Sequence, residues 1–258
     1  MSLNPPKAFL FDFDGTLAAD LSVPTKEMIE VLHNIALKIP IGIISGASLH
    51  RLRVSLMDFL AQELYRNVIL FPHNSIEAYL HDGQQWRQHY SHGLTDSEND
   101  QIKYHAQRAL VATGVADGTP IVGEQFHPGP MFGLSVIGSS TPKEIKDAWD
   151  PDRKKRVKII KHFYEYAPQI FAFAQANYGG RTCVDFMRKG IDKSHGARWF
   201  AAHHNLDERE IMYFGDSFYP GGNDERVATT NMQIYKVAGP NETFEYLSNI
   251  LKKQFFVN

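Results

Sequence analysis

The feature that most constrains the fold is an alternation of short apolar runs with longer amphipathic segments near the start of the chain. The apolar runs are KAFLFD (7–12), PIGIIS (40–45) and NVILFP (67–72), and each has the length and composition of a buried strand. Residues 24–39 and 48–64, between these runs, predict helices. Strand, helix, strand, helix, strand is typical of a parallel sheet covered by helices, so the α/β class is predicted.

The middle of the chain interrupts this alternation. Residues 75–90 predict a hairpin that turns at Asp82-Gly83, and Asp150 and Pro151 predict the N-cap and first residue of a helix. The further strands and the two helices expected here lie at 96–114, 119–126, 131–138, 151–167, 169–176 and 181–187. We therefore expect an α+β domain, residues 84–187, to be inserted into a core domain of residues 1–83 and 188–258.

The first pattern resumes after the insertion. Residues 193–205 and 241–256 predict helices, and residues 210–216 and 233–239 predict buried strands. The two ends of the chain together predict a doubly wound, Rossmann-like parallel sheet, with the inserted domain beside it.

Composition excludes several classes of function. The 258 residues carry 27 Lys and Arg against 29 Asp and Glu, so no basic excess indicates nucleic acid or a membrane surface as partner. No apolar run approaches the ~20 residues that span a bilayer, and the N-terminus lacks the features of a signal peptide. Cys183 is the single cysteine, which fits a reducing, cytoplasmic compartment. We expect a small-molecule partner, and the oligomeric state is left open.

Polar side chains follow the predicted core strands at the edge where ligands bind in open α/β sheets. Two like-charged carboxylates at the end of one strand repel each other and resist desolvation, so a bound cation is expected there. Carboxylates, a hydroxyl and an ammonium together suit phosphoryl transfer through an aspartyl phosphate. The side chains concerned are those of Asp12, Asp14, Ser45, Lys193 and Asp216.

These motifs resemble a known family. FDFDGTL (11–17) is similar to the first motif of the haloacid dehalogenase (HAD) superfamily. FGDSFYPGGND (214–224), DFMRKGIDKSHGARWF (185–200) and FPHNSIEAYLHDG (71–83) resemble its eukaryotic-type phosphomannomutase branch, which carries a type IIB cap. The matches are collinear and, with the insertion, span nearly the whole chain. The resemblance implies a HAD core and an α+β cap inserted between the second and third motifs.

The resemblance also implies roles for the core residues. Asp12 would be the nucleophile, and Asp14 would act as general acid and then general base. Mg²⁺ would bridge Asp12, the backbone carbonyl of Asp14 and Asp216. Ser45, which is followed by Gly46, would donate a hydrogen bond to a phosphoryl oxygen, and Lys193 would supply positive charge.

Supporting and substrate-binding residues follow in the same way. Asn223 and Asp224 would hold Lys193 and the waters of the metal. In the inserted domain, Asp185 would contact sugar hydroxyls, and Lys146 falls near an expected arginine. Arg188 is a further candidate for substrate binding.

The chain departs from the family at the arginines that hold the second phosphate of a hexose bisphosphate. Leu21 stands where one arginine is expected, and GEQFHPGPMFGLSVIGSS (123–140) contains none. Since a mutase needs this clamp, we expect a Mg²⁺-dependent phosphohydrolase acting on a small phosphorylated metabolite, with a sugar phosphate as first choice. The first alternative is a phosphomannomutase that uses Lys146, Arg181 or Arg188 as the clamp. The second is a non-catalytic sugar-phosphate-binding protein.

Each motif alone also has an ordinary structural explanation. Asp-x-Asp-Gly and the GGND segment (221–224) occur in turns, and Lys193 alone would be a solvated helix residue. The occurrence of four motifs in order favours the catalytic interpretation. His73 and the pair His203-His204 have no ligand partners in the sequence, so no metal site is assigned to them.

Overall fold

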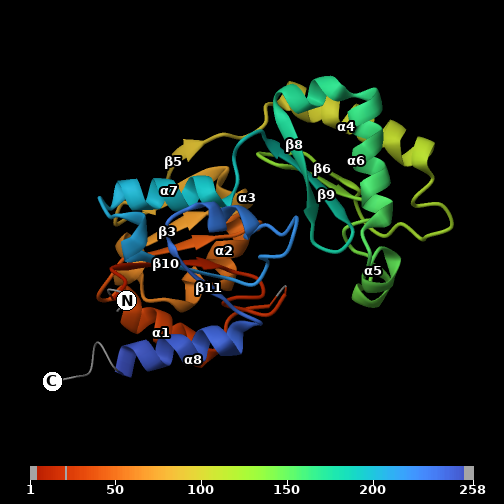
Figure 1. Ribbon diagram of the computed structural model, residues 1–258. Helices are drawn as coiled ribbons and strands as arrows, with labels where there is room; N and C mark the ends of the chain where they lie inside the picture. Colours follow the sequence, from red (N-terminus) through yellow and green to blue (C-terminus); the bar gives the residue numbers. More distant parts are fainter. Residues whose placement is uncertain (1–4, 21, 253–258) are drawn as a thin grey trace. The chain divides into compact units, whose positions relative to one another are not determined.

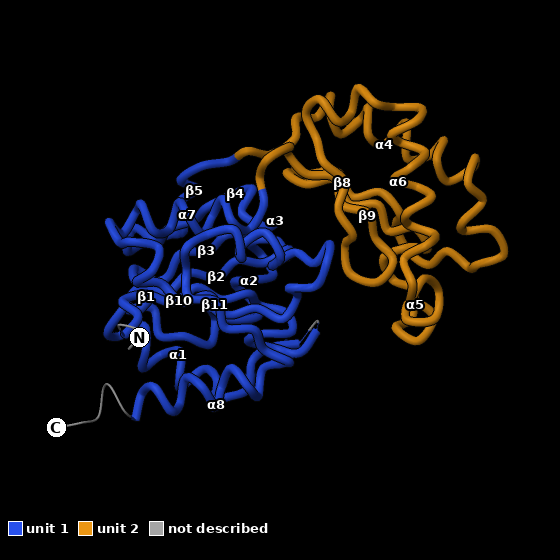
Figure 2. The backbone as a smooth tube through the Cα atoms, in the orientation of Figure 1, with its two compact units in different colours: residues 1–91, 192–258 blue, residues 92–191 orange. Residues whose placement is uncertain are grey.

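The computed structural model describes residues 5–20 and 22–252 (Figure 1). The chain forms two compact units, unit 1 from residues 1–91 and 192–258 and unit 2 from residues 92–191 (Figure 2). The boundaries differ from those expected at 84 and 187. The difference arises because β5 (Trp86–Ser91) pairs with β4 (Glu77–His81) as the last strand of the sheet of unit 1.

Unit 1 is built on a seven-stranded sheet with the order β11-β10-β1-β2-β3-β4-β5. Five strands run parallel to one another, whereas β4 pairs antiparallel with its two neighbours, β3 and β5. These five are β1 (Ala8–Asp12), β2 (Ile41–Ile44), β3 (Val68–Phe71), β10 (Ile211–Gly215) and β11 (Gln233–Lys236). Strand β1 lies at the centre of this parallel part, between β2 and β10. The five parallel strands confirm the predicted α/β class.

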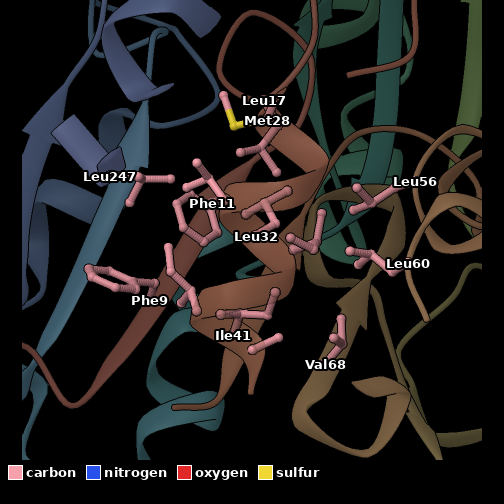
Figure 3. Close-up of a cluster of buried hydrophobic side chains, with 14 of the residues drawn as sticks. Phe9, Phe11, Leu17, Met28, Leu32, Ile41, Leu56, Leu60, Val68 and Leu247 are labelled. Atoms are coloured by element: carbon pink, nitrogen blue, oxygen red, sulfur yellow. The ribbon is translucent and has the colours of Figure 1, made fainter. Parts of the chain in front are cut away.

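Helices cover both faces of this sheet. Phe9 and Phe11 of β1 pack in one buried cluster with residues of the helices on the first face (Figure 3). Ala8 and Leu10 of the same strand belong to a second cluster with the helix of the other face. The alternation follows from the period of two in a strand, and it makes every side chain of β1 a buried one. The helices are α1 (Lys26–Ala36), α2 (Leu49–Ser55) and α8 (Pro240–Ile250) on the first face and α7 (Lys193–His203) on the second.

One predicted helix of unit 1 is shorter than expected. The helix expected over 48–64 ends at Ser55, and the 3₁₀ turns η1 (Met57–Phe59) and η2 (Gln62–Asn67) follow it. The irregular path lets Leu56, Leu60 and Leu64 all enter the first core cluster. Tertiary burial here overrides helix propensity.

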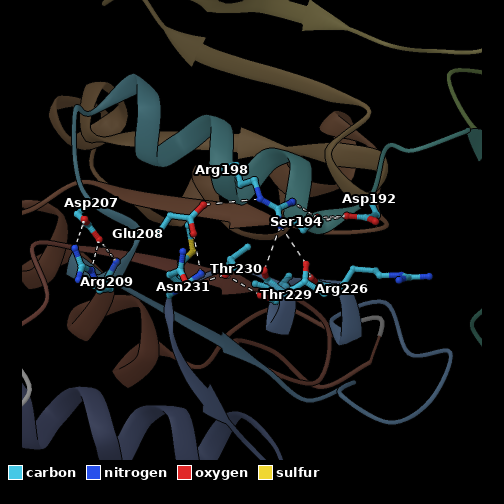
Figure 4. A network of polar contacts seen from close by, with 12 residues as sticks. Asp192, Ser194, Arg198, Asp207, Glu208, Arg209, Arg226, Thr229, Thr230 and Asn231 are labelled. Carbon is cyan, nitrogen blue, oxygen red and sulfur yellow. Dashed lines mark hydrogen bonds and ion pairs between the residues drawn. The ribbon is translucent and has the colours of Figure 1, made fainter.

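Helix α7 is attached to the segment that follows Asp224 by a polar network (Figure 4). Arg198 donates from Nη1 to the Ser194 hydroxyl at 2.8 Å and from Nη2 to the Thr229 hydroxyl at 3.1 Å. Thr229 is the last residue of the 3₁₀ turn η5 (Glu225–Thr229). The network therefore joins the helix that begins at Lys193 to the turn that follows Asp224.

Unit 2 is an α+β unit with a four-stranded antiparallel sheet in the order β6-β7-β9-β8. Its core joins the sheet to the two longer helices through side chains such as Phe132, Phe163 and Phe186. The elements are α4 (Asp96–Thr113), β6 (Phe126–His127), β7 (Phe132–Ser135), α5 (Lys143–Trp149), α6 (Lys154–Tyr166), η3 (Pro168–Ala172), β8 (Ala174–Gly179) and β9 (Cys183–Arg188).

Three local predictions for unit 2 are wrong. Of residues 119–126, only Phe126 lies in a strand, because Gly123 adopts a φ of +80° and the segment makes irregular loop contacts. Residues 169–172 of the strand expected over 169–176 belong instead to the 3₁₀ turn η3. Helix α6 begins at Lys154 rather than at Pro151, and Asp150 caps it from outside by accepting the N–H of Lys155 at 2.9 Å.

Within the described part of the chain, no helix combines the length and the apolar character needed to cross a membrane.

Candidate active site

The predicted core residues meet at the carboxyl end of the parallel strands of unit 1. Asp12 ends β1, Ser45 follows β2, and Asp216 follows β10. Parallel pairing of Asp12 with Ile44 and of Phe11 with Phe214 brings these strand ends to one edge of the sheet. The apolar strand β1, which has β2 on one side and β10 on the other, thus ends in the carboxylate of Asp12, which is only 4% exposed.

Lys193, the first residue of α7, is the centre of the site. Its Nζ lies 2.6 Å from Asp12 Oδ1 and 2.8 Å from Asp224 Oδ1, and its side chain is 0% exposed. Burial alone would lower the pKa of Lys193, but the two carboxylates more than offset this and raise its pKa. Burial also raises the pKa of Asp12 well above its ordinary value, against the opposing charge of Lys193. The ammonium is therefore the group that lets two buried carboxylates share one site.

Asp224 is held by two further donors. The Tyr213 hydroxyl donates to Asp224 Oδ1 at 2.5 Å, and the backbone N–H of Ser217 donates to Oδ2 at 2.9 Å. Gly215 makes room for this arrangement, since a Cβ added there would lie 2.5 Å from Asp224 Oδ2. Sequence reasoning found Asp224 but missed Tyr213. The only signal in the sequence was a hydroxyl-bearing residue within an otherwise apolar strand.

Three carboxylates form an acidic cluster that fits a divalent cation. Asp12, Asp216 and Asp224 each offer an oxygen within 4.8 Å of the others. Burial raises the pKa of Asp216 as well as that of Asp12, so an added positive charge would stabilise both as carboxylates. Because both oxygens of Asp224 already accept hydrogen bonds, Asp12 and Asp216 are the residues suited to hold the ion. An oxygen-only donor set is what Mg²⁺ prefers.

A glycine shapes the approach of Asp216 to the backbone next to Asp14. Gly15 has a φ of +81°, and a Cβ added there would lie 2.6 Å from Asp216 Oδ2. The glycine of the Asp-x-Asp-Gly motif is therefore needed both for its backbone conformation and for the space it leaves. The role of the Asp14 carbonyl as a metal ligand stays a prediction.

The Asp14 side chain makes an ion pair that the sequence did not reveal. Arg51 of α2 places Nη2 at 2.6 Å from Asp14 Oδ1, with side-chain exposures of 26% and 30%. The guanidinium also lies 5.9 Å from the ring centroid of the buried Phe13. As expected from the +2 spacing, Phe13 enters the core and Asp14 does not. Arg51 lies on the short helix α2, where sequence alone suggests a solvated residue.

Ser45 is buried and supported by an unusual turn. Its hydroxyl accepts the N–H of Ala47 at 3.0 Å, which leaves its own O–H for donation. Its carbonyl accepts the N–H of Asn74 at 2.7 Å. His73, Asn74 and Ser75 have consecutive positive φ values of 52°, 55° and 75°, a conformation that costs energy in non-glycine residues. Such strain at the end of β3, beside the Ser45 loop, is typical of a functional site.

The remaining supporting residues lie near this group. Gly46 follows Ser45, and a Cβ added there would meet the Asn74 amide at an ordinary 3.5 Å. Asn223 is exposed in the turn that precedes Asp224, and its expected contact with Lys193 and metal waters stays a prediction.

The candidate substrate residues belong to unit 2. Asp185 lies on β9 above Gly179, where an added Cβ would lie 2.2 Å from its carboxylate. Lys146 Nζ donates to the carbonyl of Ser139 at 2.7 Å. Arg188 donates to both carboxylate oxygens of Glu98, at 2.7 and 2.8 Å. The substrate roles of Asp185, Lys146 and Arg188 stay predictions.

Two further positions bear on the phosphate clamp. Arg181 forms an ion pair with Asp147 in unit 2. Leu21, which stands in place of an expected arginine, lies outside the described residues.

Comparison with known proteins decides the family. The sequence profile described as "Eukaryotic phosphomannomutase" matches residues 28–253. The chain belongs to this phosphomannomutase family. A phosphomannomutase of Triticum aestivum is 26% identical over 260 residues, which cover 93% of this chain and 94% of that protein. The expected resemblance to the phosphomannomutase branch is confirmed.

Solved structures agree on the fold of this phosphomannomutase-family chain. IMP-bound IMP-nucleotidase of Plasmodium falciparum matches with a TM-score of 0.68 and 16% identity, over 96% of this chain and 68% of that one. A haloacid dehalogenase-like hydrolase of Bacteroides thetaiotaomicron matches with a TM-score of 0.65 and 12% identity, over 95% and 99% of the two chains. The HAD fold is confirmed. The names of the sequence relatives agree better with the mutase alternative than with the hydrolase that we expected.

Proposed function

We propose that this protein is a Mg²⁺-dependent phosphoryl-transfer enzyme that takes the phosphoryl group of a hexose phosphate onto Asp12. The observation that carries the proposal is the buried contact between Lys193 and Asp12, 2.6 Å long, at the edge of the acidic cluster. A carboxylate beside a fixed ammonium has the charge environment that a transferring phosphoryl group needs.

The residues divide the reaction between them. Asp12 attacks phosphorus, an acyl phosphate forms, and the bond between phosphorus and the sugar oxygen breaks. Asp14, once released from its ion pair with Arg51 and protonated, gives its proton to the leaving oxygen and later takes one from the attacking hydroxyl or water. Lys193 and Ser45 face the phosphoryl oxygens as donors. Mg²⁺, held by Asp12 and Asp216, would neutralise charge on the phosphoryl group.

We propose that the phosphoryl group on Asp12 is next transferred to the hydroxyl of a second sugar phosphate. This is the activity of a phosphomannomutase. Membership in the family and similarity to phosphomannomutases along nearly the whole chain support this choice. This choice places the mutase activity before hydrolysis, whereas the missing arginines suggested hydrolysis first.

Hydrolysis is the second candidate, because specific observations in unit 2 favour it. Residues 119–142 contain neither arginine nor lysine. Each cation considered as a substitute clamp is already engaged within the unit, Lys146 by the Ser139 carbonyl, Arg181 by Asp147 and Arg188 by Glu98. A cation that must leave an internal partner binds a second phosphate less favourably. Water would then compete for the phosphorylated Asp12.

One assay separates these activities. Mannose 1-phosphate is incubated with the protein and Mg²⁺, with and without mannose 1,6-bisphosphate, and mannose 6-phosphate and inorganic phosphate are followed in parallel. A mutase forms mannose 6-phosphate faster than it releases phosphate, and a phosphatase does the reverse. Binding of the sugar phosphate without either product would support the non-catalytic alternative and contradict the proposal.

A further inference from the structure

Tyr213 is a buried tyrosine whose hydroxyl faces the catalytic charges. It lies in β10 with 0% exposure, and its ring packs edge-on against Phe218 at a centroid distance of 6.1 Å. Its hydroxyl donates to Asp224 Oδ1 at 2.5 Å, to the same oxygen that accepts from Lys193 Nζ at 2.8 Å. Burial, together with the charge of Asp224, raises the pKa of Tyr213 well above its ordinary value, so the hydroxyl keeps its proton.

Packing alone does not explain a hydroxyl at this position. The neighbours of Tyr213 in β10 are Ile211, Met212 and Phe214, and phenylalanine would fill the same volume without a buried polar atom. A buried hydroxyl without a partner is unfavourable, so its value depends on the acceptor it meets. The acceptor here is the carboxylate that shares Lys193 with Asp12. Gly215 lies directly beneath this contact, since a Cβ there would be 2.9 Å from Tyr213 Cε1 and 2.5 Å from Asp224 Oδ2.

The hydrogen bond changes how Asp12 and Asp224 compete for Lys193. One Asp224 oxygen accepts from the Ser217 N–H, which fixes the plane of the carboxylate. Asp224 Oδ1 accepts hydrogen bonds from both the Tyr213 hydroxyl and the Lys193 ammonium. It therefore binds Lys193 less tightly than an oxygen that accepts from Lys193 alone. Lys193 Nζ contacts both carboxylates at once, at 2.6 Å from Asp12 Oδ1 and 2.8 Å from Asp224 Oδ1, so a change at Asp224 is felt at Asp12.

We propose that Tyr213 is a positioning residue for phosphoryl transfer: its hydroxyl fixes Asp224 so that Lys193 stays directed at Asp12. The inference rests on the proposed function, since it assigns Asp12 and Lys193 their roles in the reaction. It adds a residue whose hydroxyl contacts Asp224 and which acts on the reaction through Asp224 and Lys193.

The test is Tyr213→Phe, which removes only the hydroxyl. Tyr65→Phe is the matched control, since the buried Tyr65 hydroxyl of the same unit donates to the Met57 carbonyl at 2.7 Å, away from the acidic cluster. We expect Tyr213→Phe to lower kcat about tenfold or more while KM for the sugar phosphate changes less than about threefold. The affinity for beryllium trifluoride with Mg²⁺, measured by calorimetry, should fall in parallel. Tyr65→Phe should change neither quantity more than about twofold.

A double-mutant cycle with Asp224→Asn shows whether Tyr213 acts through Asp224. The two substitutions together should cost less than the product of their separate effects, in beryllium trifluoride affinity and in the midpoint of urea unfolding. Fully independent effects, or a kcat of Tyr213→Phe equal to that of the wild type, would overturn the inference and leave the proposed function intact. If the wild type neither turns over a sugar phosphate nor binds beryllium trifluoride, the proposed function fails. The unfolding cycle then still decides whether Tyr213 holds Asp224.

Discussion

Lys193 Nζ lies between two buried carboxylates, 2.6 Å from Asp12 and 2.8 Å from Asp224, and its side chain has no exposure to solvent. The lysine starts α7, and the two aspartates come from the end of β1 and from the turn after β10. A single charge thus joins three segments that are far apart in the sequence. The same contact serves stability and chemistry, because the site would otherwise hold like charges out of water.

The first prediction concerns this lysine. Lys193→Met leaves Asp12 and Asp224 buried without their counter-charge, so the free energy of unfolding should fall by about 3–5 kcal/mol and turnover should be lost. Urea denaturation of the metal-free protein measures the first effect. Lys7→Met is the control, since Lys7 pairs with Glu210 at 2.6 Å on the surface and should contribute little. Equal losses in the two variants would contradict the prediction.

The nucleophile gives the second prediction. Asp12→Asn keeps the size of the side chain but removes the attacking oxygen anion, so turnover should fall to the background of the assay while the fold is retained. Beryllium trifluoride, which mimics the phosphoryl group on an aspartate, should no longer bind in calorimetry. Asp58→Asn changes an exposed carboxylate of the same unit and should leave activity unchanged. A folded Asp12→Asn protein with substantial turnover would refute the mechanism.

The raised pKa values of Asp12 and Asp216 predict how Mg²⁺ and pH act together. A carboxyl with a higher pKa in the folded state binds protons better there, so its contribution to stability is present at low pH. That contribution is lost as pH rises from the unfolded pKa through the folded one. Mg²⁺ should offset the loss by binding the ionised carboxylates. The rise in Tm on adding Mg²⁺ should therefore be larger at about pH 8 than at about pH 5.

Calorimetric scans with Mg²⁺ and with EDTA at both pH values measure this difference, and an Asp12→Asn/Asp216→Asn variant should abolish it. EDTA should also remove activity, and added Mg²⁺ should restore it. An increase in Tm that is independent of pH would place the ion elsewhere.

The left-handed turn at the end of β3 gives the fourth prediction. Ser75 has a φ of 75°, its side chain is fully buried, and its hydroxyl has no hydrogen-bond partner among the described residues. Ser75→Gly should stabilise the protein by about 1 kcal/mol, because glycine adopts this conformation without the steric cost. Ser75→Ala removes the hydroxyl but keeps the strained backbone, so it should stabilise less. Urea midpoints of the two variants decide between strain and the unpaired hydroxyl.

Much of unit 1 and its site could be predicted from the sequence, because each core strand is a short apolar run that ends in the polar residue the site uses. Asp12, Ser45 and Asp216 stand at such ends, and a parallel sheet collects them at one edge. The identity of the partners of these residues could not be predicted in the same way. Tyr213 reads as one more core aromatic, and Arg51 as one more solvated helix residue, until distances across the fold are known.

The missed elements share a physical cause. Residues 119–126 and the second half of the expected helix at 48–64 have the composition of regular elements, but loop contacts and burial of leucines decide their actual paths. The first boundary of unit 2 lies at residue 92 rather than at the expected 84, because pairing of β5 with β4 is a contact between strands that local composition does not encode.

The position of β1 between β2 and β10 also sets the order in which the protein can mature during synthesis. Strand β10 is translated only after all of unit 2, so the edge of β1 that pairs with β10 lacks its neighbour while the ribosome adds roughly 200 residues, at about 5–20 residues per second. Unit 2 is continuous and has its own core, so it can fold during this interval. A nascent chain therefore carries Asp12 without Lys193 or Asp216, and it gains the complete charge set only after Asp224 has been added.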